Sequence, residues 1–124
     1  MLTGLLLATT VWPACTRSDL TPEIAARVSS PAARARGRRL FLTHCALCHG
    51  EDANGRGPRR SAFARPPRDF TDIAWRRSTS PRKVFDAIHN GVAGTAMPAW
   101  AVLGDDAIWD LTAFVLAASD APSR

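Results

Sequence analysis

A short motif, Cys-Ala-Leu-Cys-His at residues 45–49, restricts this chain more than any other feature of its sequence. Residues three apart share one face of a helical turn, so Cys45 and Cys48 can act together, with His49 directly beside them. Three kinds of site use such a group: a structural zinc site, a redox-active dithiol, and a covalently attached haem.

The three kinds of site make different demands on the rest of the chain. A structural zinc site needs four ligands, usually from two spaced pairs, and His44 and His89 do not form a second pair. A thioredoxin-like dithiol needs a preceding strand within a βαβ unit, while the residues before Cys45 favour a helix. Haem fits best: Cys45 and Cys48 would form thioethers, and His49 would be an axial ligand to the iron.

The first 14 residues carry no charge and are mostly apolar. They are too short to span a bilayer as a helix but are typical of an export signal. Haem of this kind is attached to the protein outside the cytoplasm, so the haem motif and the export signal agree with each other. Ala14 before Cys15 resembles the acylation site of a bacterial lipoprotein, so residues 1–14 predict a signal peptide, with Cys15 lipidated on the periplasmic side of the membrane. A plain cleaved signal or an uncleaved anchor is the alternative.

The length of 124 residues allows one domain. We expect a flexible tether over residues 15–30, a folded domain over 31–119 and a short tail over 120–124. The segments 50–68 and 91–100 are rich in glycine and proline and are expected to be loops. No segment has the pattern of a strand, so the fold class is all-α, with three to five helices. These are expected over residues 32–45, 69–75, 80–90 and 104–118.

Four stretches resemble the small class I c-type cytochromes that carry one haem. They are Gly-Arg-Arg-Leu-Phe at 37–41, the motif with its glycine at 45–50, Gly-Thr-Ala-Met-Pro-Ala-Trp at 94–100, and the last helix at 108–117. The resemblance implies a small cytochrome c fold around one covalently attached haem c. It also implies that the first and last helices cross at close range, with Gly37 and Phe41 meeting Phe114.

A methionine is expected to be the second axial ligand to the iron. In the family this residue belongs to a Met-Pro pair well downstream of the haem motif, which matches Met97 and Pro98. The other methionine, Met1, lies in the predicted signal. A thioether ligand favours ferrous iron and raises the reduction potential. His89 in place of Met97 is the alternative ligand, although a packed or surface histidine is the expectation at that position.

Residues around the haem follow from the same resemblance. His49 is expected to donate its second ring N–H to a proline carbonyl, which fixes the ring plane. The expected acceptor is Pro58, with Pro66 as the alternative. Trp100 is expected to pack beside the haem edge near Met97. The side chains expected to bind the haem propionates are Arg65, Arg68 and Trp75.

The formal net charge of +5 favours an acidic redox protein as partner, with anionic lipid near Arg34 to Arg39 as a second possibility. Nucleic acid is not expected for an exported protein. With both axial positions filled, the chain is predicted to be a one-electron carrier in a bacterial respiratory or dehydrogenase chain, and not an enzyme. The alternatives are a haem-based sensor or catalyst of small ligands, with a displaceable Met97, and a colourless dithiol redox protein.

Overall fold

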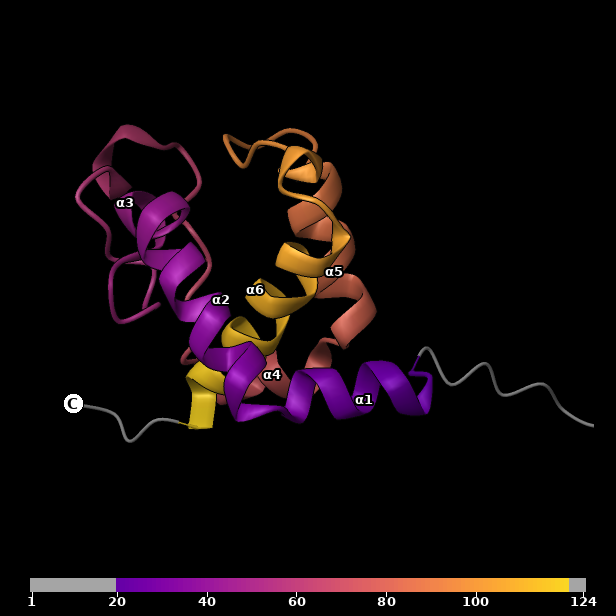
Figure 1. Ribbon diagram of the computed structural model, residues 1–124. Coiled ribbons are helices and arrows are strands. Elements are labelled where there is room, and N and C mark those ends of the chain that lie inside the picture. The colour runs from indigo at the N-terminus through magenta and orange to yellow at the C-terminus, as the bar shows by residue number, and fades with distance from the viewer. Residues whose placement is uncertain (1–19, 121–124) are drawn as a thin grey trace, which may run out of the picture.

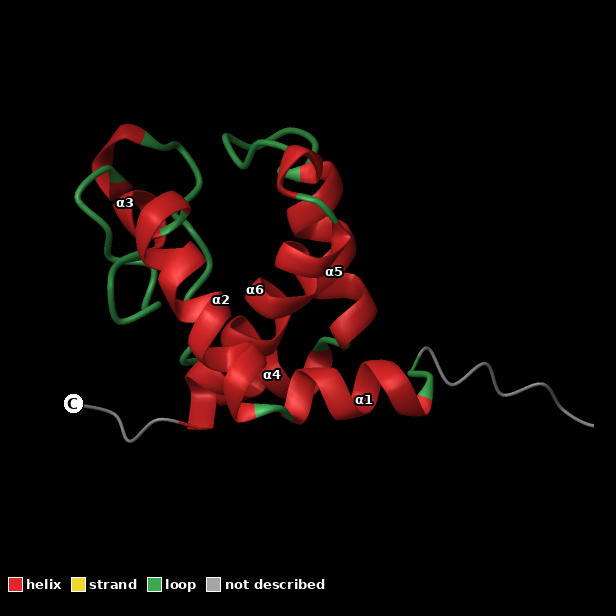
Figure 2. Cartoon of the chain, in the orientation of Figure 1, coloured by secondary structure: helices red, strands yellow, loops and turns green. Residues whose placement is uncertain are grey.

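In the computed structural model, which describes residues 20–120, the chain consists of helices joined by loops, with no strand in that range (Figures 1 and 2). The expected all-α class is confirmed. The α-helices are α1 (Pro22–Ser29), α2 (Pro31–His44), α3 (Ala46–His49), α4 (Ile73–Ser78), α5 (Pro81–Asn90) and α6 (Asp105–Ala117). Short 3-10 helices span Arg60–Ala62, Ala101–Leu103 and Ala118–Asp120. None of these helices is long and apolar enough to cross a bilayer.

Helix α1 lies within residues 15–30, where the sequence predicts a flexible tether. The Thr21 hydroxyl caps its first turn. Arg27 then forms ion pairs with two carboxylates of α6, at 2.7 Å to Asp106 and 3.4 Å to Asp110. The tether prediction is therefore wrong for this helix, because its partners lie about 80 positions further along the chain and give no local signal. The folded unit extends N-terminally of the predicted boundary at residue 31.

Several predictions concern parts of the chain outside the described residues. They are the signal over residues 1–14, the lipidated Cys15, the first part of the tether, and residues 121–124 of the tail. These remain predictions from the sequence. Helices α1 and α3 raise the number of α-helices between residues 20 and 120 to six, above the three to five expected.

The crossing of α2 and α6 forms the centre of the fold (Figure 1). Helix α2 begins as expected, with Ser30 as its cap. A Cβ atom at Gly37 would lie 1.9 Å from the carbonyl oxygen of Asp110, so the two backbones touch at this point. One turn later the rings of Phe41 and Phe114 are 4.9 Å apart. The predicted contact between the first and last helices of the domain is confirmed.

The remaining helices cover this crossing. Helix α5 ends at Asn90 and is followed, as predicted, by Gly91, which has a positive φ of 72°. The turn expected over residues 69–75 is the helix α4, which begins later because the Asp72 carboxylate caps it at Ala74. The buried side chains of the hydrophobic core that are larger than alanine come from α2, α5 and α6: Phe41, Val84, Phe85, Ile88, Ile108, Leu111, Val115 and Leu116.

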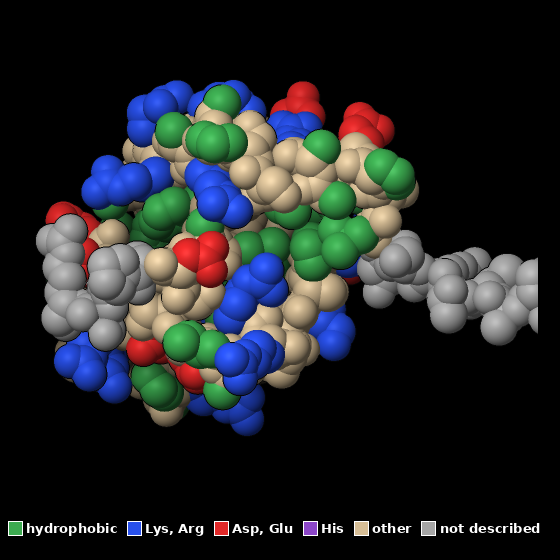
Figure 3. All heavy atoms as spheres, turned by 90° about the horizontal axis from the view of Figure 1, so that it is seen from below, with side chains coloured by type: hydrophobic (Ala, Val, Ile, Leu, Met, Phe, Trp, Pro, Cys, Tyr) green, Lys and Arg blue, Asp and Glu red, His purple; other side chains and the backbone are tan. Residues whose placement is uncertain are grey.

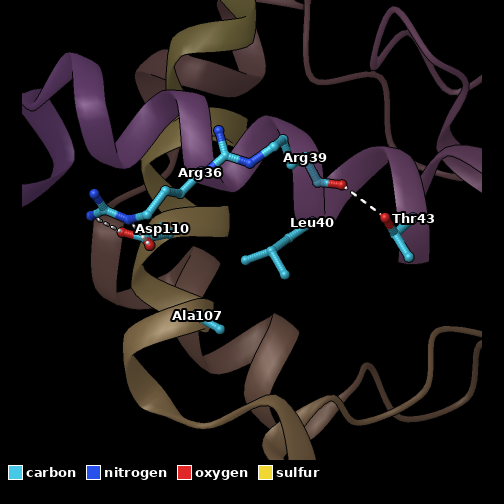
Figure 4. Close-up of a pocket in the computed structure, with 6 residues that line it drawn as sticks. All are labelled: Arg36, Arg39, Leu40, Thr43, Ala107 and Asp110. Carbon is cyan, nitrogen blue, oxygen red and sulfur yellow. Dashed lines mark hydrogen bonds and ion pairs between the residues drawn. The ribbon is translucent and has the colours of Figure 1, made fainter.

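An ion cluster joins α1, α2 and α6. The Asp110 side chain, 8% exposed, accepts hydrogen bonds from Arg36 Nε at 2.7 Å and Arg36 Nη2 at 3.0 Å. Arg27 reaches the same carboxylate from α1. Figure 4 shows the Arg36–Asp110 pair at the edge of a surface hollow between α2 and α6. Burial raises the pKa of Asp110, but the hydrogen bonds and charges of Arg36 and Arg27 outweigh it and hold the pKa below its usual range.

We expect Asp110→Asn to lower the free energy of unfolding at pH 7 by about 2 kcal/mol, because it weakens hydrogen bonds to a buried charge. A lowered folded pKa means that the ionised carboxylate stabilises the fold above its unfolded pKa of about 3.9, and that this contribution is lost as the pH falls through the folded pKa. The difference between wild type and variant should therefore shrink below about pH 4.

Denaturant unfolding at pH 7 and pH 3 measures both effects. The matched control is Asp106→Asn, which removes a carboxylate that also contacts Arg27 but is 93% exposed, and should change stability little. An Asp110→Asn difference that stays constant with pH would show that the ion cluster does not contribute through the charge of the carboxylate.

Candidate haem-binding site

The two cysteines of the motif lie on a single helical turn. The backbone N–H groups of Cys48 and His49 both donate to the Cys45 carbonyl, at 3.1 and 2.9 Å. Gly50, with a φ of 80°, ends this turn. Both thiols are free and half-buried, and Cys45 packs against the hydrophobic core. The structure thus places Cys45, Cys48 and His49 on one helical turn, as the sequence predicts.

The Cys45 thiol is held in its neutral form. Burial first, and the charge of Cys48 beside it second, together raise the pKa of Cys45 to about 12. A thiol with such a pKa is protonated at neutral pH, and a thioether at this position would have no ionisable group at all. The apolar surroundings of Cys45 therefore suit a sulfur that is bound to carbon.

His49 is oriented by a backbone carbonyl and by an aromatic ring. Its Nδ1 atom lies 3.1 Å from the carbonyl oxygen of Arg68. A carbonyl only accepts, so we assign the proton to Nδ1, which leaves Nε2 with a free lone pair. The imidazole stacks on Phe70, with centroids 4.7 Å apart. Burial lowers the pKa of His49, opposed by the hydrogen bond to Arg68, so the ring is in the neutral form that binds metals.

The carbonyl that orients His49 differs from the one predicted. Pro58 and Pro66 were expected, and both are exposed and do not bind the imidazole. The first half of the loop after the motif packs against the motif itself, where the Gly57 N–H donates to the Cys48 carbonyl at 3.1 Å. The carbonyl that reaches His49 therefore comes from the second half of the loop. Residue spacing in a loop rich in glycine and proline does not reveal this path.

Two tryptophans predicted to line the haem lie near the motif. Trp75 is half-buried, with its ring 5.1 Å from that of Phe70. The Trp100 ring is 5.4 Å from that of His44, the residue before Cys45. His44 is thus half-buried against a tryptophan. The guanidinium groups predicted for the propionates, those of Arg65 and Arg68, are exposed.

Met97 lies on a loop that is closed onto the end of α5. Its carbonyl accepts from the Val92 N–H at 3.2 Å, and the Trp100 N–H donates to the Ile88 carbonyl at 2.9 Å. The methionine is half-buried and packs against the hydrophobic core. Because Trp100 contacts His44, this loop lies next to the haem motif. The structure therefore places one end of the loop that carries Met97 against the residue before the haem motif.

His89, the alternative ligand, is engaged elsewhere. Its Nδ1 atom lies 2.8 Å from Asn90 Oδ1, and its Nε2 atom lies 3.7 Å from a carboxylate oxygen of Asp105. Its ring also stacks on Phe85, with centroids 5.7 Å apart. This matches the expectation of a packed histidine.

The chemistry of the donors fits a haem. Within residues 20–120 no three side chains of His, Cys, Asp or Glu form a group that could hold a metal ion, so a zinc ion would lack a full set of ligands there. An imidazole nitrogen and a thioether sulfur are typical axial ligands of haem iron, whose porphyrin supplies the other four donors. His49 and Met97 can provide that pair, while Cys45 and Cys48 would bind the macrocycle.

Phe70, Gly57 and Gly91 are part of the site but were not identified from the sequence. Phe70 covers one face of the His49 ring. A Cβ atom at Gly57 would lie 2.5 Å from the Cys48 carbonyl, and one at Gly91 would lie 2.8 Å from the Met97 carbonyl. These contacts follow from the folding of two loops, and no local pattern signals them.

Comparison with known proteins identifies the family. The model of the family "Cytochrome C oxidase, cbb3-type, subunit III" matches residues 32–115. The chain is 36% identical over 91 residues to the cbb3-type cytochrome c oxidase subunit FixPc of Rhizobium leguminosarum bv. viciae, covering 70% of this chain and 28% of that protein. It is 32% identical over 115 residues to the subunit CcoP of Rubrivivax gelatinosus, covering 86% of this chain and 35% of that protein.

A solved structure has a similar fold. A chain of the reducing HAO-like protein complex of Kuenenia stuttgartiensis superposes with a TM-score of 0.64 and 30% sequence identity, over 73% of this chain and 45% of that one. The chain spans only about a third or less of its curated relatives. The family match covers more than half of the chain, and it includes the haem motif and Met97. The resemblance to c-type cytochromes is confirmed: this chain belongs to the family of cbb3-type cytochrome c oxidase subunit III.

Proposed function

We propose that this domain binds one haem c and carries single electrons by alternating between Fe(II) and Fe(III). Cys45 and Cys48 would hold the macrocycle through thioethers, and His49 and Met97 would be the axial ligands. The orientation of His49 is the observation that carries the proposal. Its Nδ1 atom is committed to the Arg68 carbonyl, which leaves Nε2 free beside two thiols on the same turn.

The arrangement favours a carrier over a sensor or an enzyme. Met97 lies on a loop held by hydrogen bonds at both sides, from Val92 to Met97 and from Trp100 to Ile88. A ligand on such a loop keeps the sixth position of the iron filled, so no substrate can bind there. Electron transfer without a change of ligands also keeps the reorganisation of the site small.

The relatives are named as subunits of cbb3-type cytochrome c oxidases. By analogy, we infer that this chain exchanges electrons with redox proteins of a respiratory chain, either as a shuttle or as a subunit of a complex. The predicted export signal and Cys15 would place the domain on the periplasmic side of the membrane. Arg65, Arg68 and Trp75 are our candidates for the haem propionates, and Trp100 for the haem edge near Met97.

Absorption spectra of the periplasmically expressed protein test the proposal. Reduced wild type should show c-type bands, and the oxidised form should show the weak near-infrared band of iron bound to methionine sulfur. Met97→Ala should lose that band, bind CO in the reduced state, and have a reduction potential lower by on the order of 100 mV, because a thioether favours Fe(II).

The control for this experiment is Val102→Ala, in the 3-10 helix Ala101–Leu103, five residues after Met97. Its side chain is 89% exposed, so the variant should behave as wild type in all three measurements. A wild type that lacks the near-infrared band and binds CO at neutral pH would instead favour a sensor or catalyst. A colourless protein would favour the dithiol alternative.

A further inference from the structure

The net positive charge of the chain resides in one loop. Residues 56–68 hold five arginines and no acidic residue: Arg56, Arg59, Arg60, Arg65 and Arg68. The whole chain has 16 basic and 11 acidic residues, so without this segment the two counts are equal. We call residues 56–68 the arginine loop. All five side chains are exposed, and none has a carboxylate within ion-pair distance among residues 20–120.

The arginine loop is fixed directly to the haem motif. The Gly57 N–H donates to the Cys48 carbonyl at 3.1 Å, and the Arg59 N–H donates to the Leu47 carbonyl at 3.0 Å. At its far end the Arg68 carbonyl lies 3.1 Å from His49 Nδ1. A protein bound to this loop would therefore contact the residues that surround the iron. Leu47, between the two cysteines, is 52% exposed beside the loop.

The loop that carries Met97 has the opposite character. Residues 91–104, which we call the methionine loop, contain no charged residue. Two of their large apolar side chains are exposed, Val92 at 42% and Val102 at 89%. Protein interfaces combine a centre depleted in charge with apolar contacts and a polar rim, and arginine is enriched in them. The methionine loop can supply the uncharged apolar centre of such an interface, and the arginine loop can supply its charged rim.

Both loops lie at the same end of the molecule. In Figure 1 the loop after α3 and the loop between α5 and α6 are at the top, whereas α1, where the described chain begins, is at the bottom. The bottom face, seen in Figure 3, carries acidic side chains among its basic ones. If the chain is anchored through its N-terminus, the arginine loop is at the end away from the anchor. An acidic protein is therefore a better partner for it than the lipid surface.

We propose that the arginine loop and the methionine loop together form the docking surface for an acidic redox protein. The guanidinium groups of Arg56, Arg59 and Arg60 would pair with carboxylates of the partner, as the planar fork of arginine allows. Leu47 and Val102 would make the apolar contacts. If Arg65 and Arg68 bind the propionates, these three arginines remain free for the partner.

This inference rests on the proposed function, since the docked partner exchanges an electron with the haem iron. In the reduction of the domain, the reduced centre of the partner loses one electron and Fe(III) becomes Fe(II), with no atom transferred. Complementary charge would act on the association step, because long-range attraction raises the rate of productive encounter. Salt should suppress that effect.

The test uses the holoprotein and a flavodoxin hydroquinone, an acidic one-electron donor, in stopped-flow kinetics. We expect the triple variant Arg56→Gln, Arg59→Gln, Arg60→Gln to be reduced about tenfold more slowly than wild type at low ionic strength. The two rates should converge at high ionic strength. The matched control is Arg38→Gln, Arg77→Gln, Lys83→Gln, which removes the same charge from exposed residues of α2, α4 and α5 and should change the rate less than twofold.

A second pair of variants tests the apolar part. Val102→Asp places a negative charge in the methionine loop and should slow reduction by the same donor about fivefold at low ionic strength. Ile73→Asp, at an exposed apolar residue of α4 with 56% exposure, is its control and should have little effect. Equal rates for Val102→Asp and Ile73→Asp would overturn the role of the methionine loop.

Other outcomes separate this proposal from its alternatives. Equal slowing by both triple variants would show an effect of net charge alone and would overturn the docking surface. Loss of sedimentation with phosphatidylglycerol vesicles in the arginine-loop variant, with an unchanged flavodoxin rate, would overturn it in favour of a lipid surface. The c-type spectrum and full reduction by dithionite test the proposed function separately. A variant set that disproves the docking surface therefore leaves the proposed function intact.

Discussion

Replacing Gly37 with alanine is expected to lower the free energy of unfolding of the holoprotein by about 3 kcal/mol. The new Cβ atom would lie 1.9 Å from the Asp110 carbonyl oxygen and 2.9 Å from Phe114 Cβ. Backbone atoms of α6 cannot move away without separating the two helices. The contact between Phe41 and Phe114 would open with them, and so would the ion pair between Arg36 and Asp110.

The sign of this effect distinguishes packing from helix propensity. Within a helix, alanine is favoured over glycine by about 1 kcal/mol, so propensity alone predicts that Gly37→Ala stabilises the protein. The control is Ala35→Gly, at an exposed position of the same helix, which should destabilise by about 1 kcal/mol through propensity. Thermal or denaturant unfolding of both variants decides whether packing or helix propensity determines the effect. A Gly37→Ala protein as stable as wild type would mean that α2 and α6 cross at a greater distance than the structure shows.

The elements that could be predicted from the sequence are those with local signals. Ser30 and Pro31 mark the start of α2, and Asn90 and Gly91 mark the end of α5, because caps act within one turn of the chain. The acidic pair Asp105 and Asp106 marks the start of α6 in the same way. The haem motif is also local, since its two cysteines and its histidine lie on one turn.

What could not be predicted depends on contacts between distant segments. Helix α1 looks like a polar linker until Arg27 meets the carboxylates of α6. The carbonyl that orients His49 belongs to Arg68, because a loop rich in glycine and proline can bring any of several carbonyls to the ring. The sequence also shows five arginines in one loop without showing that all five are exposed or that the loop is hydrogen-bonded to the haem motif. In each case the information lies in the path of a loop or in the docking of a helix.

The position of Met97 depends on such a path, and Gly91→Ala should disturb it strongly. A Cβ atom at Gly91 would lie 2.8 Å from the Met97 carbonyl oxygen and 2.9 Å from both Ala99 N and the Pro98 carbonyl carbon. The methionine loop would have to move away from the end of α5. We expect the oxidised variant to lose the near-infrared band of methionine ligation and the reduced variant to bind CO, although Met97 itself is still present.

The same loop provides a matched control for this substitution. Gly94 has a φ of 73°, almost equal to the 72° of Gly91, but a Cβ atom there would have no neighbour within 4 Å. Both alanine variants therefore place a Cβ atom at a positive φ, but only Gly91→Ala adds the clash, and the ψ of −177° at Gly91 belongs to a region that side chains other than glycine rarely adopt. If Gly94→Ala keeps the band and excludes CO while Gly91→Ala does not, the conformation and close packing of Gly91 against the Met97 backbone hold the sulfur in place. If both variants lose the band, strain in the loop is sufficient, and the contact at Gly91 has no separate role. If neither loses it, the iron–sulfur bond itself positions the loop.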